Sequence, residues 1–150
     1  MAINPNTDFT TGQVLTSSQA NRFPRGIMAY NSVTTASAVT TEAIQITSSS
    51  FTAVANRYYS ITYYEPELPF ATGTTASMRL RLTNISGTVY QLTKVNASAT
   101  YAEFGLCRAI TTLSAGSTVI VATLQYGSSN TPVRGATQPA FLLIEDIGPA

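Results

Sequence analysis

Few side chains of this 150-residue chain are suited to catalysis or metal binding, because it contains no histidine and only one cysteine. Histidine is the commonest general base and the commonest transition-metal ligand in proteins. The cysteine, Cys107, lies in the alternating stretch FGLCRAI, and no base that could activate a nucleophilic thiol lies nearby in the sequence. We therefore predict that Cys107 is a small buried hydrophobic residue.

Two pairs of carboxylates are the remaining candidates for chemistry. Glu65 and Glu67 flank Pro66, and a pair of carboxylates can act in a glycosidase or bind calcium. Both roles need further partners, and the sequence has neither an EF-hand pattern nor a Gly/Asp-rich repeat. We predict instead that this pair lies at a solvated strand end, and that Glu145 and Asp146 supply polarity where the last strand ends. The sequence therefore predicts no catalytic residue, no metal site, no cofactor and no enzymatic activity.

Four tyrosines form a cluster that is suited to contacts rather than to catalysis. Tyr58, Tyr59, Tyr63 and Tyr64 lie on one predicted strand, and two of the four must point to each face of a regular strand. One pair is expected to fill the core, while the other is exposed or contacts a subunit or ligand. A carbohydrate site is the less favoured use, because the chain has no tryptophan to stack on a sugar.

The composition limits the partners and the location of the protein. Only 10% of residues are charged and the net charge is +1, with the Lys and Arg residues scattered, so the basic patch that nucleic-acid binding requires is missing. No apolar run approaches the roughly 20 residues that cross a bilayer. The start, MAINPNTDF, lacks the pattern of a signal peptide, and one cysteine cannot form an internal disulfide framework. The chain combines a hydroxyl-rich surface with the absence of an export signal. This combination predicts a virion protein, which is assembled in the host cytoplasm and released by lysis.

Short apolar segments with turn residues between them predict strands over most of the chain. The expected strands are 26–33, one long or two short strands within 41–54, 57–68 ended by Pro66 and Pro69, a hairpin over 76–95, then 100–113, 117–126 and 140–148. About eight such strands indicate an all-β fold, an antiparallel β-sandwich of the jelly-roll type. We assign residues 26–150 to this domain. The run Phe141–Ile144 is apolar at every position, so both faces of the last strand are expected to be covered.

Residues 1–25 are predicted to form an extended N-terminal arm that contains a short helix. Thr16 and Gln19 match a capping box, which indicates a helix over about 17–22 that Pro24 ends. The first and last strands of a jelly roll lie near each other. We therefore expect Gly26–Tyr30 to pair with Phe141–Asp146, which places the arm beside the C-terminus.

Three stretches in this order resemble small structural proteins of tailed bacteriophages: FTTGQVLTSSQANRFPRGIMAY, FTAVANRYYSITYYEP and TTLSAGSTVIVATL followed by QPAFLLIEDIGPA. This resemblance covers most of the chain and implies a head-decoration, head-fibre or minor tail protein. The turn LSAGSTV is also similar to a hairpin of the C1q and tumour-necrosis-factor jelly rolls, which implies a homotrimer. The sequence departs from those proteins because it has no collagen-like or coiled-coil stalk.

Together these observations predict a non-enzymatic virion protein that is held on the particle by its arm. The expected arm contacts are Phe9, Val14, Leu15, Phe23 and Arg25. The expected partners are other copies of the chain and the major capsid protein or another virion protein. Two alternatives remain open at this point: a minor tail or tail-fibre protein that contacts the host surface, and a carbohydrate-binding module for a host-surface glycan.

Overall fold

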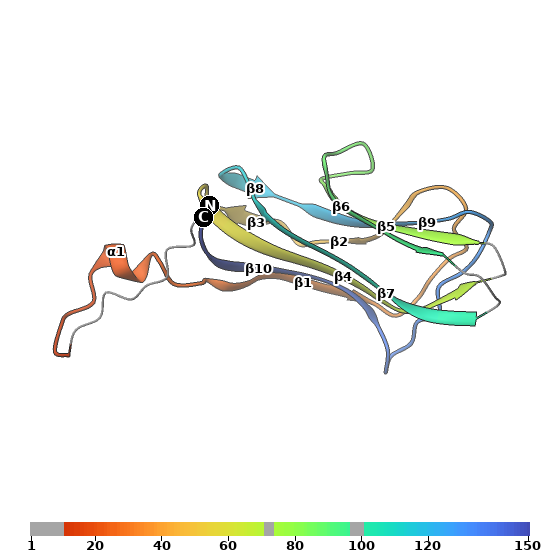
Figure 1. Ribbon diagram of the computed structural model, residues 1–150, viewed down its shortest axis with the longest axis horizontal. Coiled ribbons are helices and arrows are strands. Elements are labelled where there is room, and N and C mark those ends of the chain that lie inside the picture. The colour runs from red at the N-terminus through yellow and green to blue at the C-terminus, as the bar shows by residue number, and fades with distance from the viewer. Residues whose placement is uncertain (1–10, 71–73, 97–100) are drawn as a thin grey trace.

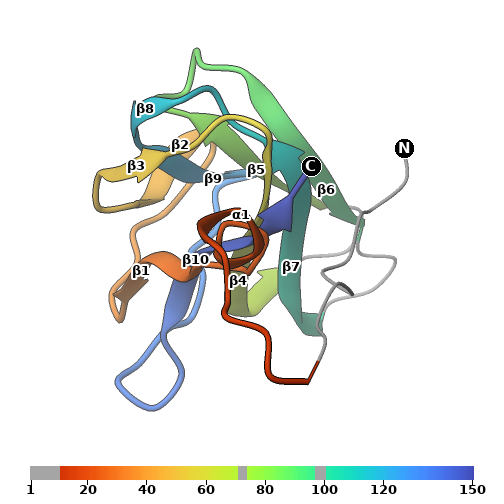
Figure 2. The ribbon, with the colours of Figure 1, turned by 90° about the vertical axis from the view of Figure 1, so that its left-hand side faces the viewer.

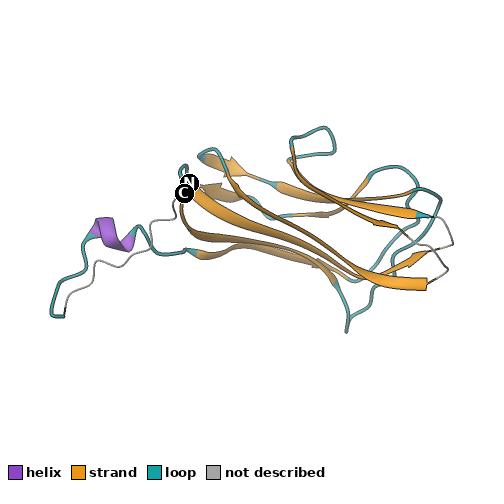
Figure 3. Ribbon diagram, in the orientation of Figure 1, coloured by secondary structure: helices purple, strands orange, loops and turns teal. Residues whose placement is uncertain are grey.

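The chain folds into antiparallel β-sheets that pack face to face, as the sequence predicts. The computed structural model describes residues 11–70, 74–96 and 101–150, and in those ranges it contains one short helix and ten strands (Figure 1). Figure 3 shows how far strands dominate the body of the molecule. The elements are α1 Ser17–Ala20, β1 Gly26–Val33, β2 Ala43–Thr47, β3 Phe51–Ala53, β4 Arg57–Phe70, β5 Thr75–Leu82, β6 Val89–Asn96, β7 Tyr101–Thr112, β8 Gly116–Thr118, β9 Ile120–Tyr126 and β10 Ala140–Pro149.

The strand order is that of a jelly roll. One sheet has the order β1-β10-β4-β7, and the other has the order β2-β9-β5-β6. The short strands β3 and β8 pair with each other as an addition to these eight. Seen from the end, the two sheets form two layers (Figure 2). Within the described ranges, no helix is long and apolar enough to cross a membrane.

The first and last strands pair with each other, as predicted. Gly26 lies opposite Asp146 and Tyr30 lies opposite Leu143, with a bulge between Ile27 and Ala29. The pairing brings the start of β1 to the end of β10, so the arm leaves the sandwich beside the C-terminus (Figure 1). The expectation for this part of the topology is confirmed.

The core lies between the two sheets. It is filled by side chains that point inward at every second position along each strand. In the β5–β6 hairpin, Met78 and Leu80 are fully buried while Arg79 and Arg81 point outward, as the alternation predicts. Gly105 on β7 faces the same core. A Cβ atom there would lie 2.4 Å from the sulfur of Met78 and 2.7 Å from a methyl carbon of Leu68, so a larger residue would force these two core side chains to shift.

The prediction that prolines end the tyrosine-rich strand is wrong, because β4 continues through both of them to Phe70. Pro66 falls at an irregularity in the pairing with β7, between Glu65 and Leu68. On its other edge, β4 pairs with β10 only as far as Tyr64. The absence of a backbone N–H at Pro66 and Pro69 therefore removes no regular ladder bond to β10.

Candidate functional site

The N-terminal arm extends away from the sandwich, with α1 beyond the end of the sheets (Figure 1). The capping box is present: the Thr16 hydroxyl accepts from the backbone N–H of Gln19, and the Gln19 side chain accepts from the Thr16 backbone N–H at 3.0 Å. The helix is one turn, Ser17–Ala20, and is shorter than the expected 17–22. The arm thus has defined local structure outside the hydrophobic core.

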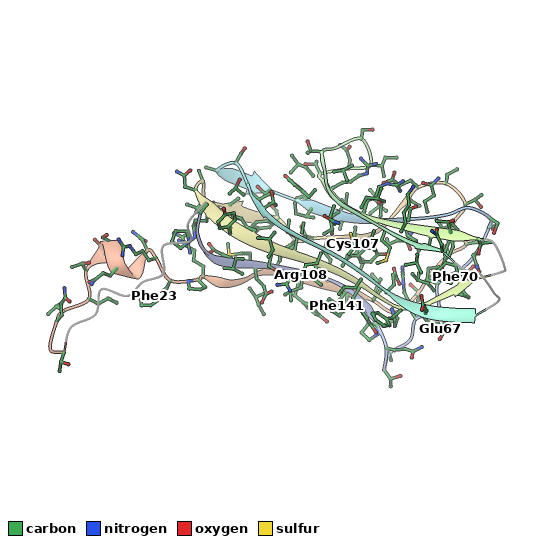
Figure 4. All side chains as sticks on the ribbon, in the orientation of Figure 1. Phe23, Glu67, Phe70, Cys107, Arg108 and Phe141 are labelled. Carbon is green, nitrogen blue, oxygen red and sulfur yellow. The ribbon has the colours of Figure 1, made fainter. Side chains whose placement is uncertain are left out.

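The predicted contact residues of the arm are exposed where the structure describes them. Val14 is 85% exposed, Leu15 48% and Phe23 41%, while Phe9 lies outside the described residues. Phe23 lies at the base of the arm, between α1 and β1 (Figure 4). Arg25 lies at the same end, where its Nε is 4.0 Å from a carboxylate oxygen of Asp146.

A buried ion pair holds the base of the arm against the sandwich. Arg57 of β4 donates from Nε to Asp146 Oδ2 at 2.5 Å and from one terminal nitrogen to Asp146 Oδ1 at 2.7 Å. The same guanidinium donates to the backbone carbonyls of Asn21 at 2.5 Å and Phe23 at 2.6 Å. The hydrogen bond with Asp146 raises the pKa of Arg57 above its ordinary value, so the guanidinium stays charged. We call Arg57, Asp146 and these two carbonyls the arm clamp.

The arm clamp overturns one expectation. Asp146 does not supply solvated polarity at the end of the last strand, because it is 1% exposed and its partner Arg57 is 4% exposed. Its Oδ1 also accepts from the backbone N–H of Gly148 at 3.0 Å. The adjacent Glu145 is half-buried and points to the opposite face of the strand.

Glu65 overturns a second expectation, because it is fully buried rather than solvated. It accepts a hydrogen bond from the Tyr63 hydroxyl and forms an ion pair with Arg134, whose Nε lies 2.9 Å from Glu65 Oε2. Arg134 also donates to the Thr35 carbonyl and to Gln45 Oε1, each at 2.8 Å. Burial and the adjacent Glu65 raise the pKa of Tyr63, so the hydroxyl remains a donor. The cluster ties the loop 127–139 to both sheets, through Glu65 on β4 and Gln45 on β2, and Glu67 is not part of it.

Cys107 is a fully buried core residue, as predicted, and it lies between the two layers in Figure 4. Burial raises the pKa of its thiol, which disfavours the thiolate that a nucleophile would need. Among the described residues there is no group of three or more Cys, Asp or Glu side chains that could hold a metal ion.

The four clustered tyrosines divide between the two faces of β4 as predicted. Tyr59 and Tyr63 are fully buried in the core, and Tyr58 and Tyr64 lie on the outer face, where both are half-buried. Tyr59 is fixed by a hydrogen bond from the backbone N–H of Val54 to its hydroxyl, at 2.8 Å. The four residues therefore do not form a single site.

Tyr64 is one of four rings that cross the outer face of the sheet β1-β10-β4-β7, one on each strand. The ring centroids lie 6.0 Å apart for Tyr30 and Phe141, 5.2 Å for Phe141 and Tyr64, and 6.4 Å for Tyr64 and Phe104. We call these four residues the aromatic row. The expectation that the last strand is covered on both faces is only partly met, because Phe141 and Leu143 on its outer side are half-buried.

Further apolar residues surround the aromatic row. Ile27 on β1 and Leu106 and Ile110 on β7 are all exposed, and the strand register places them on the same outer surface. We call this surface, formed by the aromatic row with Ile27, Leu106 and Ile110, the apolar face.

The outer surface of the other sheet carries a charged network over its central strands. Arg81 forms a two-point ion pair with Glu42 at 2.6 and 2.9 Å, and Arg79 lies 3.4 Å from the same carboxylate. Thr123 donates to Glu42 Oε1 at 2.6 Å. Beneath these side chains, the outward residues Val121 and Thr123 are fully buried. The network thus shields Val121 and Thr123, whereas Ile44 on β2 is 43% exposed and Val89 and Leu92 on β6 are 43% and 41% exposed.

The Glu42 network predicts a loss of stability in acid. Burial alone would raise the pKa of Glu42 above its ordinary 4.5, but the hydrogen bonds from Arg81 and Thr123 and the charges of the two arginines lower it. The stabilisation is therefore complete above pH 4.5 and is lost as pH falls through the lowered pKa. Glu42→Gln should cost about 1 kcal/mol at pH 7, and this difference should shrink toward pH 3 in urea titrations. An unchanged difference at both pH values would contradict the assignment.

Comparison with protein-family models and with curated proteins finds no match to this chain. The resemblance to phage structural proteins therefore stays a prediction. The structure brings together the base of the arm, Asp146 and Arg57, and separately gathers one row of aromatic residues on a sheet face. Sequence reasoning missed Arg57, Arg134 and the apolar face, although the spacing of Phe104, Leu106 and Ile110 on one strand was a signal for the last of these.

Proposed function

We propose that this chain is a non-enzymatic structural protein of a tailed-phage virion. In this proposal it assembles as a jelly-roll homotrimer, and its N-terminal arm attaches it to the particle, with the capsid as the favoured location. The observation that carries the proposal is an arm that extends from the sandwich, exposes apolar side chains, and has its base held by a buried ion pair.

The energetics of the arm support a docking role. Covering Val14, Leu15 and Phe23 would remove apolar surface from water, and each fully buried side chain of this size is worth about 1.5–3 kcal/mol. The arm clamp fixes the direction in which the arm leaves the body, so less conformational freedom is lost on docking. An arm with no partner would gain nothing from this arrangement.

A carbohydrate-binding role receives less support. Sugars stack on the open faces of aromatic rings, but the rings of Tyr64 and Phe141 stack on each other, with their planes 27° apart. Their faces are therefore partly occupied within the chain. A tail location is an alternative within the virion proposal, and the number of copies per particle separates the two locations. Hundreds of copies in purified particles would indicate the capsid, a handful would indicate the tail, and complete absence would refute both.

Removing the arm should abolish incorporation into particles while the sandwich remains folded. A deletion of residues 1–20 keeps the carbonyls of Asn21 and Phe23 that Arg57 binds, so the arm clamp is retained. Circular dichroism should show the unchanged β-sandwich, and immunoblots of purified particles should show at least a ~10-fold loss of the chain, which corresponds to about 1.4 kcal/mol of attachment free energy.

A point variant gives a matched control for this deletion. Leu15→Asp should reduce incorporation, whereas Ile85→Asp, on the loop between β5 and β6 and of almost equal exposure (47% against 48%), should not. Equal incorporation of the Leu15 variant and the wild-type chain would mean that the arm is not the anchor.

A further inference from the structure

The two outer faces of the sandwich differ in a way that calls for a partner on one of them. The sheet β2-β9-β5-β6 buries its outward Val121 and Thr123 beneath arginine side chains paired with Glu42. The sheet β1-β10-β4-β7 leaves five large apolar side chains between 47% and 66% exposed, Ile27, Tyr30, Phe104, Leu106 and Ile110, whereas the other sheet has three at 41% to 43%, Ile44, Val89 and Leu92. A contiguous apolar surface of this kind is typical of an interaction surface rather than of a solvated one.

We propose that the apolar face is where copies of this chain contact one another. This inference rests on the oligomer in the proposed function and names the surface that forms it. Two observations favour a second copy over a different partner: the charges on the face and its size.

The charges on the apolar face are self-complementary. At the outward positions of β7 and β10 that alternate with core residues, Arg108 and Glu145 are the charged side chains, and neither forms an ion pair with another described residue. Glu103, beside Phe104 on β7, is also exposed. Arg108 donates only to the hydroxyl of Ser60, at 3.1 and 3.2 Å. Arg108 and Glu145 carry opposite charges, so this part of the face is electrostatically complementary to a second copy of itself. A neighbouring copy can place its Glu145 opposite Arg108, reciprocally about a two-fold axis or in sequence around a three-fold axis.

The size of the face is at the lower end of the range for a biological contact. Four strands about 4.8 Å apart, with about eight residues each at about 3.3 Å, form a surface of about 500 Å². Two copies would together bury about 1,000 Å², the minimum expected of a biological interface and somewhat less than the roughly 1,200–2,000 Å² of stable ones.

A matched pair of leucines tests this proposal. Leu106 lies on β7, at the edge of the apolar face, and is 47% exposed; Leu92 lies on β6, at the edge of the other sheet, and is 41% exposed. By analytical ultracentrifugation of the full chain at micromolar concentration, the wild type should be an oligomer. Leu106→Arg should be a monomer, and Leu92→Arg should remain an oligomer. A monomeric wild type would overturn the proposal, and it is the result expected if a glycan or a different protein covers the face. The same mass for both variants would also overturn it.

Charge reversal provides a second test that does not depend on tolerance of arginine at position 106. Arg108→Glu and Glu145→Arg should each weaken association at least ~10-fold, and the double variant should restore it; no restoration would overturn the predicted pairing. A mass of three chains agrees with the proposed homotrimer, and a mass of two supports this face but refutes the trimer. These measurements use the purified chain and no particles. A chain that does not oligomerise is therefore distinguishable from a chain whose arm does not attach to particles.

Discussion

Glu65→Ala is expected to lower the free energy of unfolding by about 3–5 kcal/mol, because it leaves a buried guanidinium without its carboxylate. The Arg134 side chain is 2% exposed and that of Glu65 is fully buried, so water cannot replace the lost partner. The Tyr63 hydroxyl loses its acceptor in the same change. Urea denaturation followed by tyrosine fluorescence measures the difference directly.

Glu67→Ala is the control for this prediction, since Glu67 is two residues away on the same strand and is half-buried. It should change stability by about 0.5 kcal/mol or less. The apolar pair Glu65→Leu with Arg134→Met should recover most of the loss, because it removes both charges together. Equal effects of the Glu65 and Glu67 changes would contradict the buried ion pair.

Arg57→Ala should lower the free energy of unfolding about as much as Glu65→Ala does, and it should also release the arm from the sandwich. The substitution leaves the buried carboxylate of Asp146 without its main partner, which costs about 3–5 kcal/mol. It also removes both side-chain donors to the carbonyls of Asn21 and Phe23. Thermolysin should therefore cleave the arm of the variant at least ~10-fold faster than that of the wild type under conditions in which the sandwich stays folded.

Arg25→Ala separates the arm clamp from a general effect of charge near Asp146. Arg25 is at 4.0 Å from the carboxylate and its side chain is 44% exposed, so its loss should cost about 1 kcal/mol or less and should leave arm cleavage unchanged. Equal cleavage rates for the Arg57 variant and the wild type would refute the arm clamp.

The architecture could be predicted from the sequence because local patterns and topology agreed. The alternation in Met78–Arg81, the capping box at Thr16, and the turn-bounded segments each specify structure over a few residues. The pairing of β1 with β10 required only the additional rule that the ends of a jelly roll meet. The continuation of β4 through Pro66 and Pro69 was not predictable from these patterns, because it depends on where the neighbouring strand β10 stops pairing.

The charged residues were the part that sequence reasoning could not place. Glu65 and Asp146 were expected to be solvated because carboxylates are rarely buried without partners. Their partners are far away in sequence: Arg134 is 69 residues from Glu65, and Arg57 is 89 residues from Asp146. Arg134 also lies in an irregular loop, where no periodicity indicates which way a side chain points. Only the folded chain reveals these pairs.

Electron cryomicroscopy of the virion to which we propose that this chain belongs tests the central claim most directly. The proposal predicts density for the two-layered sandwich on the particle surface, with residues 11–23 in contact with a different virion protein and the apolar faces turned toward neighbouring copies. Particles that lack this density, or that hold the sandwich while the arm contacts nothing, would contradict the proposal.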